Sequence, residues 1–211
     1  MINLLKSLLS ISDNKWGQYA FSRDPLNHRL TPEIRDNLIE KSMKCGIHEA
    51  QILKEQYGIL RPIDYADKFG VKINLEDSYG SEDYIMFARF NEPKDITIFT
   101  ANIKKTNEFL HEYNLNEFLG HVDICNMLIA HELYHYCESQ QSNIFTRQKH
   151  IKLWHIGPIV YRSNLITTKE IAAMAFAKEL VGINFNPFLF DILMLCPHDF
   201  EKASVILKHV I

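Results

Sequence analysis

The amino-acid sequence predicts an α+β fold that is mostly helical, with a small sheet of about three strands and a central helix. Three observations lead to this prediction. Apolar residues recur at helical spacing, between capping residues, over most of the chain. Between residues 71 and 99 the pattern changes to that of strands, with alternation at 71–75 and continuous β-prone runs at 84–90 and 96–99. An apolar run in the middle of the chain ends in His-Glu-Leu-Tyr-His at 131–135.

Composition restricts the function classes. With 211 residues and 46% hydrophobic content, the chain is long enough to bury a sizeable core as one globular domain. A net charge of -3 without a basic run argues against a direct nucleic-acid surface. The densest apolar stretch, 185–196, is interrupted by Pro187 and Asp191 and is too short to cross a membrane. The cysteines lack C-x-x-C spacing, which predicts free thiols and a cytoplasmic protein.

Residues 1–46 are predicted to form an N-terminal helical extension, and residues 47–211 the main domain. Leucines at helical spacing indicate a short amphipathic helix over 1–11, and residues 12–30 are expected to be an irregular link. The next helix is expected to begin after Thr31 as N-cap, with Pro32 in its first position, and to end at Gly46.

The main domain is predicted to begin with two helices, 47–57 and 62–69, each followed by a glycine. Strands are predicted at 71–75, 84–90 and 96–99, the last two joined by a hairpin loop at 91–95. A helix follows at 102–113.

The central helix is predicted from about residue 115 through Glu138, with a bend at Gly120 and a polar loop after it at 139–147. A helix of high propensity is predicted at 169–180, ended by Gly182. The apolar stretch 185–195 is interpreted either as a buried C-terminal helix or as an exposed contact surface.

The motif at 131–135 indicates a zinc site. Histidines four residues apart lie one helical turn from each other, so His131 and His135 can bind one Zn²⁺ while Glu132 faces a water molecule. The alternative is that both are core histidines satisfied by backbone groups or water. A helix that is apolar on most of its circumference favours the metal, because two buried histidines each need a polar partner.

A third ligand has to come from outside this helix. Glu138 is about 10 Å along the helix from His131, which is too far. Glu138 and Gln141 also stand where a metzincin has Gly and His, so that class is excluded. His150 and His155 are each a candidate ligand, a candidate transition-state donor or a surface residue.

Glu170 is the other candidate for the third ligand. It shares one face of the 169–180 helix with Ala173, Met174 and Ala177, and the small alanines permit close helix packing. Alternatively, Glu170 closes a capping box with Thr167. Spacing alone leaves both interpretations open.

The chain resembles the ImmA/IrrE family of zinc metallopeptidases over roughly residues 47–182. The resemblance rests on PIDYADKFGV at 62–71, the H-E-x-x-H, and E-x-x-A-x-x-F-A beginning at Glu170. It implies a zincin-like fold and a gluzincin-like site, with His131, His135 and Glu170 as zinc ligands and Glu132 as general base. The chain departs from the family at Tyr134, Met174 and the Val-Gly pair at 181–182, which affects the expected pocket shape more than the metal.

The sequence is therefore interpreted as a zinc-dependent metalloendopeptidase that cleaves a protein substrate. The resemblance implies a transcriptional repressor of a mobile element or stress response as that substrate. The rival interpretation is a non-catalytic binding module that keeps the fold and regulates a partner protein by contact, with residues 185–195 as its contact surface.

Overall fold

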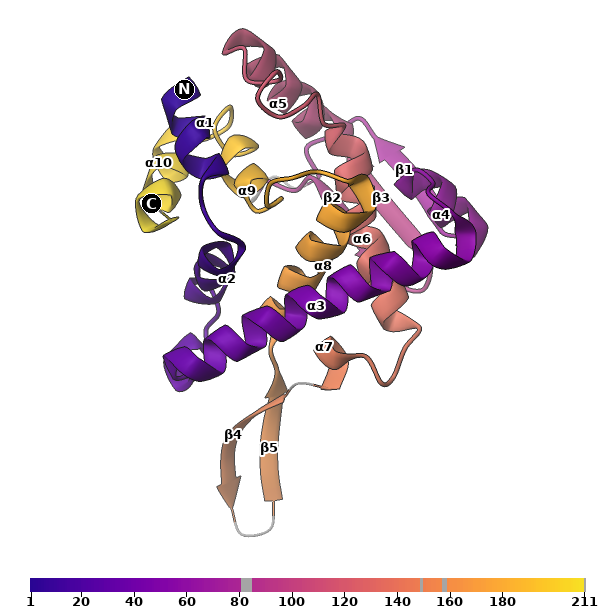
Figure 1. Ribbon diagram of the computed structural model, residues 1–211, viewed down its shortest axis with the longest axis vertical. Coiled ribbons are helices and arrows are strands. Elements are labelled where there is room, and N and C mark those ends of the chain that lie inside the picture. Colours follow the sequence, from indigo (N-terminus) through magenta and orange to yellow (C-terminus); the bar gives the residue numbers. More distant parts are fainter. Residues whose placement is uncertain (81–84, 149, 157–158, 211) are drawn as a thin grey trace.

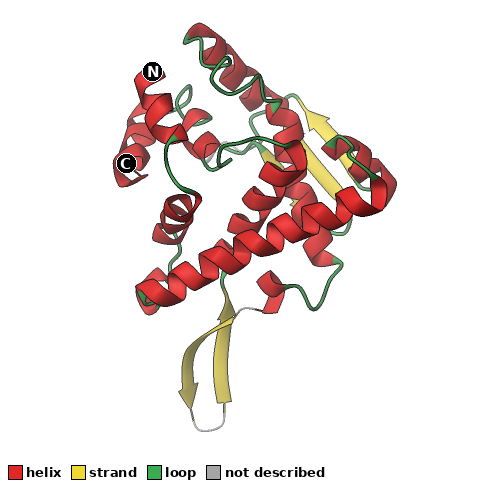
Figure 2. Cartoon of the chain, viewed as in Figure 1, coloured by secondary structure: helices red, strands yellow, loops and turns green. Residues whose placement is uncertain are grey.

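The computed structural model describes residues 1–80, 85–148, 150–156 and 159–210, with backbone alone for 150–156, 159–164 and 209. It is an α+β structure dominated by helices (Figures 1 and 2). The helices are α1 (Ile2–Leu9), α2 (Asp13–Ser22), a 3-10 turn (Asn27–Arg29), α3 (Pro32–Tyr57), α4 (Pro62–Phe69), α5 (Thr100–Glu112), α6 (Ile124–Ser139), α7 (Phe145–Gln148), α8 (Ile166–Val181), α9 (Leu189–Leu193) and α10 (Phe200–Val210). The strands are β1 (Lys72–Glu76), β2 (Ala88–Asn91), β3 (Asp95–Phe99), β4 (His150–Ile156) and β5 (Ile159–Asn164).

The predicted three-stranded sheet is confirmed, and it is mixed. Its order is β1-β3-β2, with β3 parallel to β1 and antiparallel to β2. The β2–β3 hairpin falls where the loop was predicted, although β2 begins at Ala88 and Tyr84 lies outside the described residues. As the outer strand next to β3, β2 leaves one backbone edge without a strand partner in the described sheet. That edge becomes important at the site.

A second, two-stranded antiparallel sheet was not predicted. It consists of β4 and β5, which follow α7 and precede α8. The polar loop expected at 139–147 is also partly helical, since α7 begins at Phe145. The side chains of His150 and His155 lie outside the described residues, so their predicted roles stay open.

The helix end predicted at Gly46 is wrong. α3 runs without interruption through Gly46 to Tyr57, so the boundary expected between residues 46 and 47 falls inside one helix. Gly46 is there for packing: a Cβ atom at this position would lie 2.0 Å from the carbonyl oxygen of Ala172 and 2.9 Å from the amide nitrogen of Phe176. The missing side chain lets α3 and α8 pack with their backbones in contact.

Gly46→Ala is therefore expected to destabilise the protein, although alanine is the better helix former by about 1 kcal/mol. The new Cβ would meet backbone atoms, which cannot rotate away, so α3 and α8 must separate, at a cost of about 3 kcal/mol or more. Chemical denaturation would measure this. Lys41→Ala, on the exposed face of the same helix, is the control and should be nearly neutral. A Gly46→Ala protein of equal or higher stability would contradict the packing described.

Residues 12–30 are also more ordered than predicted. Ser12 caps α2 by accepting a hydrogen bond from the Lys15 amide, and α2 extends to Ser22. Gly17 does not break this helix, because it lies against Ile39 of α3, where a Cβ atom would come within 2.5 Å of a side-chain carbon. Both N-terminal glycines thus mark close helix contacts instead of ends.

The central helix begins later than predicted. Residues 115–123 form turns, with Gly120 and His121 at φ angles of 63° and 53°, values that end a right-handed helix. α6 then starts after Asp123, whose side chain accepts a hydrogen bond from the Asn126 amide. The motif histidines consequently lie near the middle of α6, as its eighth and twelfth residues.

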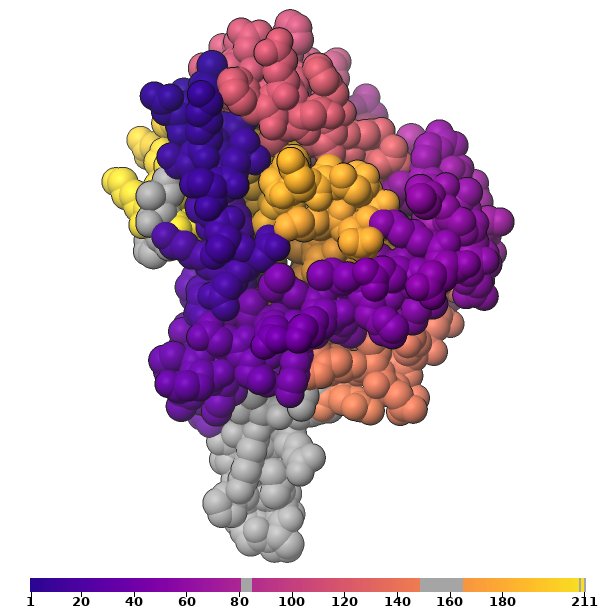
Figure 3. Space-filling model, viewed as in Figure 1, coloured from indigo at the N-terminus to yellow at the C-terminus, as the bar shows by residue number. Residues whose placement is uncertain are grey.

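The core is built around α8, which packs between α3 and α6 (Figure 1). Ala172, Ala173, Phe176 and Ala177 are fully buried there. In Figure 3 the N-terminal segment and α3 frame the surface formed by residues after 165. Most of 185–195 is buried, so the predicted alternative of an exposed contact surface is wrong.

Two further predictions concern cysteines and membranes. All four cysteines are free, as expected: Cys45, Cys125, Cys137 and Cys196. Among the described residues, no helix combines the length and the apolar character needed to cross a bilayer.

Candidate metal centre

α6 brings His131 and His135 together on its buried side. Helical spacing places them one turn apart, and their Nε2 atoms are 3.2 Å from each other. Their side chains are only 13% and 18% exposed. Nδ1 of His131 is buried without a hydrogen-bond partner among the described residues, so its polar contacts are made through Nε2.

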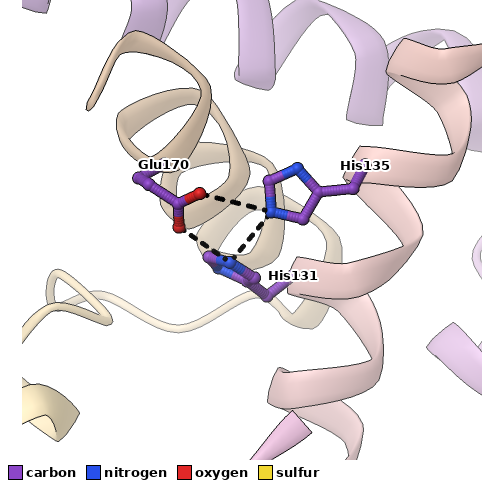
Figure 4. A group of neighbouring side chains, drawn as sticks. All are labelled: His131, His135 and Glu170. Atoms are coloured by element: carbon purple, nitrogen blue, oxygen red, sulfur yellow. Dashed lines mark hydrogen bonds and ion pairs between the residues drawn. The ribbon is translucent and has the colours of Figure 1, made fainter. Parts of the chain in front are cut away.

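Glu170 comes from the first half of α8 and faces this histidine pair (Figure 4). Its two carboxylate oxygens lie 3.3 Å from Nε2 of His131 and 3.7 Å from Nε2 of His135. The capping-box alternative is wrong. α8 begins at Ile166 with Leu165 as N-cap, and the Thr167 hydroxyl donates to Asp24 instead of capping the helix.

The three side chains fit one zinc ion. Four ligands at about 2.05 Å in a tetrahedron are separated by about 3.3 Å, and the observed separations of 3.2, 3.3 and 3.7 Å lie close to that value. Two imidazoles and one carboxylate are also the ligand types found in catalytic zinc sites, which keep a fourth position open. Within the described residues, this is the one group of three or more such side chains whose ligand atoms all lie within 4.8 Å of one another.

The closeness of these three side chains shifts the pKa value of each. Burial lowers the pKa of His131, but its hydrogen bond to Glu170 and the charge of that carboxylate outweigh burial and raise the pKa to about 9. Burial and the charge of His131 lower the pKa of His135 to about 4. Burial alone would raise the pKa of Glu170, yet the two histidines hold it at about 2. These directions favour an ionised Glu170 paired with a protonated His131.

Zinc binding is therefore expected to release about one proton per ion at pH 7. Zinc needs a neutral imidazole, and the raised pKa of His131 means that its proton must be displaced below about pH 9. The association constant should rise with pH through the neutral range, and the part of this rise that comes from His131 should end once the pH exceeds the raised pKa of that residue. Calorimetric titration in buffers of different ionisation enthalpy counts the released protons. A count near zero at pH 7 would contradict this arrangement.

Glu132 lies beside this group of three side chains and is not part of it. It projects from α6 towards the sheet, where its Oε2 accepts a hydrogen bond from the Phe90 amide at 2.8 Å. Only 8% of this residue is exposed. Burial raises the pKa of Glu132, with a smaller opposing contribution from His131. The result is a carboxylate fixed in direction and more basic than one in water, which suits proton transfer.

Glu138 is excluded from the ligand group, as predicted. Its buried carboxylate accepts a hydrogen bond from Thr146 and forms an ion pair with Lys169 at 3.1 Å. The Tyr134 hydroxyl lies 3.0 Å from the same threonine. The end of α6 is thereby tied to α7 and to the residue next to Glu170, which fixes the two ligand-bearing helices relative to each other.

The ligands open onto a cleft of about 410 Å³. The outer strand β2 forms one wall, and the start of α8 forms another. The lining residues are Ala88, Arg89, Phe90, Glu92, His131, Glu132, His135, Glu138, Ser139, Arg147, Lys169 and Glu170. An extended peptide placed along β2 would therefore pass the three ligands and Glu132.

Sequence reasoning missed the groups that orient the site. The Phe90 contact uses a backbone amide, which no side-chain pattern reveals. Lys169 was visible beside Glu170, but its partner Glu138 is distant in sequence and carried no signal of pairing.

The site thus unites four residues that the motifs singled out: His131, Glu132, His135 and Glu170. Comparison with protein-family models, with curated proteins and with solved structures found no match to this chain.

Proposed function

We propose that the protein is a zinc-dependent metalloendopeptidase with a zincin-like fold. The observation that carries this proposal is the convergence of His131, His135 and Glu170 on one point, with Glu132 held beside them. A merely structural zinc site usually has four protein ligands, whereas three ligands and a neighbouring carboxylate are typical of hydrolytic sites.

The four residues would divide the chemistry between them. His131, His135 and Glu170 would hold Zn²⁺, which when bound polarises a carbonyl group and lowers the pKa of water. Glu132 would take a proton from the attacking water and then deliver it to the leaving amine. The Phe90 amide keeps one oxygen of Glu132 occupied, so the other oxygen is the one that receives the proton.

The substrate is proposed to be an extended protein segment that adds to the sheet at β2. The Phe90 amide of the outer strand is bonded to Glu132, and the remaining backbone groups on that edge can bind a peptide by β-strand addition, a common way to hold a peptide in an extended form. A transcriptional repressor as the substrate is supported by the resemblance to ImmA/IrrE peptidases alone. The rival interpretation, a binding module acting through residues 185–195, loses its surface because most of that stretch is buried.

The direct test is cleavage of unfolded protein. The zinc-loaded protein should cut a denatured mixed protein pool, a chelator should stop the cleavage, and added Zn²⁺ should restore it. Mass spectrometry of the fragments would locate the cuts. Full zinc occupancy without any cleavage of unfolded chains or of a candidate repressor would overturn the proposal and favour a regulatory role by contact.

A further inference from the structure

A second hollow, of about 340 Å³, adjoins the metal centre, and Glu170 belongs to the walls of both. Its other walls come from α2, the first turns of α8 and the region of α9. The lining residues are Ala20, Arg23, Thr167, Glu170, Met174, Phe188 and Asp191. The hollow therefore lies where a residue next to the scissile bond of a peptide could be received.

Arg23 supplies the positive charge of this hollow. Its Nη1 donates to Asp191 at 2.9 Å and to the Tyr19 hydroxyl at 3.0 Å, and its guanidinium lies over the Tyr19 ring at 5.5 Å. The Asp191 side chain is 21% exposed, whereas that of Arg23 is 60% exposed. These contacts fix the guanidinium through one nitrogen, which leaves its outer edge, Nη2 and Nε, for a second partner.

The position of Arg23 relative to Glu170 is also fixed. Asp24, the next residue, accepts a hydrogen bond from the Thr167 hydroxyl at 2.7 Å. Thr167 lies three residues, close to one helical turn, before Glu170 in α8. The end of α2 is therefore attached to the same helix turn that presents the metal ligand.

The chemistry of the hollow favours a carboxylate. A guanidinium edge matches the two oxygens of a carboxylate in a bidentate pair, which a single amide cannot reproduce. Ala20, Met174 and Phe188 give the hollow apolar walls, suited to the short aliphatic stem of an acidic residue. Asp191 contacts only Nη1 of Arg23, and Glu170, the other carboxylate of the lining, pairs with the two histidines, so the second guanidinium edge is the part of the hollow that matches an anionic ligand.

We propose that this hollow is a carboxylate-binding subsite, in which Arg23 holds the carboxylate of a substrate residue next to the cleaved bond. The inference rests on the proposed peptidase function and adds a substrate class to it. The carboxylate can come from an aspartate or glutamate side chain or from the C terminus of the substrate, and both would use the same pair of guanidinium hydrogen bonds.

The experiment uses the zinc-loaded full chain and synthetic peptides of mixed sequence, one half with free C termini and the other half amidated. Mass spectrometry identifies the cut bonds. The wild type should prefer aspartate and glutamate over asparagine and glutamine about tenfold at one position beside the bond, or should cut free peptides at a fixed distance from their C termini. The first pattern identifies a side-chain carboxylate and the second a C-terminal one.

Variants of Arg23 test the residue itself. Arg23→Met should abolish the preference, and Arg23→Lys, which keeps the charge but not the fork, should retain part of it. Arg61→Met is the matched control, since Arg61 is an exposed arginine that pairs with one aspartate on α4, and it should leave the preference intact. If Arg23→Met folds poorly, the wild-type comparison of acids with amides and the Arg23→Lys result still test whether Arg23 holds the carboxylate.

The outcomes are distinguishable. Cleavage without preference for a carboxylate, or an unchanged preference in Arg23→Met, would overturn the subsite and leave the peptidase intact. Absence of any cleavage that depends on both zinc and Glu132 would overturn the peptidase and the subsite together.

Discussion

Glu132→Gln is expected to lower peptidase activity by a factor of about 10² to 10⁴ while the protein keeps its fold and its zinc. Glutamine has nearly the same shape and can still accept the hydrogen bond from the Phe90 amide, but it cannot take a proton from water. The measurement is the cleavage rate of one peptide under saturating zinc, together with the zinc content of the purified variant.

Glu108→Gln is the control for this experiment, because Glu108 is exposed on α5 and away from the cleft. Its cleavage rate should equal that of the wild type. Loss of zinc in the Glu132→Gln protein would mean that Glu132 is a ligand. An unchanged cleavage rate would mean that another group moves the proton.

Glu170→Gln is expected to weaken zinc binding by about 100-fold or more. The change removes the one anionic ligand and leaves two neutral imidazoles, and even changes behind the ligands of zinc sites cost 10- to 100-fold in affinity. Competition against a chelator of known affinity would measure the dissociation constants of variant and wild type.

Glu179→Gln provides a matched control on the same helix. Glu179 pairs with Lys54 near the other end of α8, so its loss changes an ion pair without touching the metal centre. Its zinc affinity should stay close to that of the wild type. An affinity within about a factor of two of the wild type for Glu170→Gln would remove Glu170 from the ligands and direct attention to His150 and His155.

Sequence patterns predicted most of the elements whose first and last residues carry clear start or stop signals. Pro62 and Gly70 delimit α4 as predicted, because proline at the first position and glycine in the left-handed region are positional signals. Glycine did not mark a helix end where its role was close helix packing. Gly46 has helical neighbours on both sides, and only the approach of α8, more than 100 residues later, explains it.

The β4–β5 hairpin was missed for a different reason. Residues 150–156 alternate only in part, and the two histidines among them fit a site as well as a strand, so the pattern is ambiguous. The start of α6 was missed because the apolar residues from 115 onwards have helical spacing. The backbone there forms turns instead, because Gly120 and His121 have positive φ angles.

In the candidate site, too, local spacing predicted some residues and long-range contacts place the others. His131, Glu132 and His135 share one helix turn, so their spacing was sufficient to place them together. Glu170 lies on another helix, and its capping and ligand interpretations could be separated only by where α8 begins and what Thr167 contacts. Arg23 and Asp191 gave no signal, because their pairing joins residues 168 positions apart.

The unbroken course of α3 has an evolutionary consequence. A segment that can be exchanged between genes as a module needs a joint in a loop, where a new connection leaves each side intact. Here residue 46 lies in a helix interior, and it is a glycine that packs against the backbone of α8. Recombination near residue 46 would disrupt the helix that supports Glu170, so residues on the two sides of Gly46 are expected to be inherited together and to co-vary across α3 and α8.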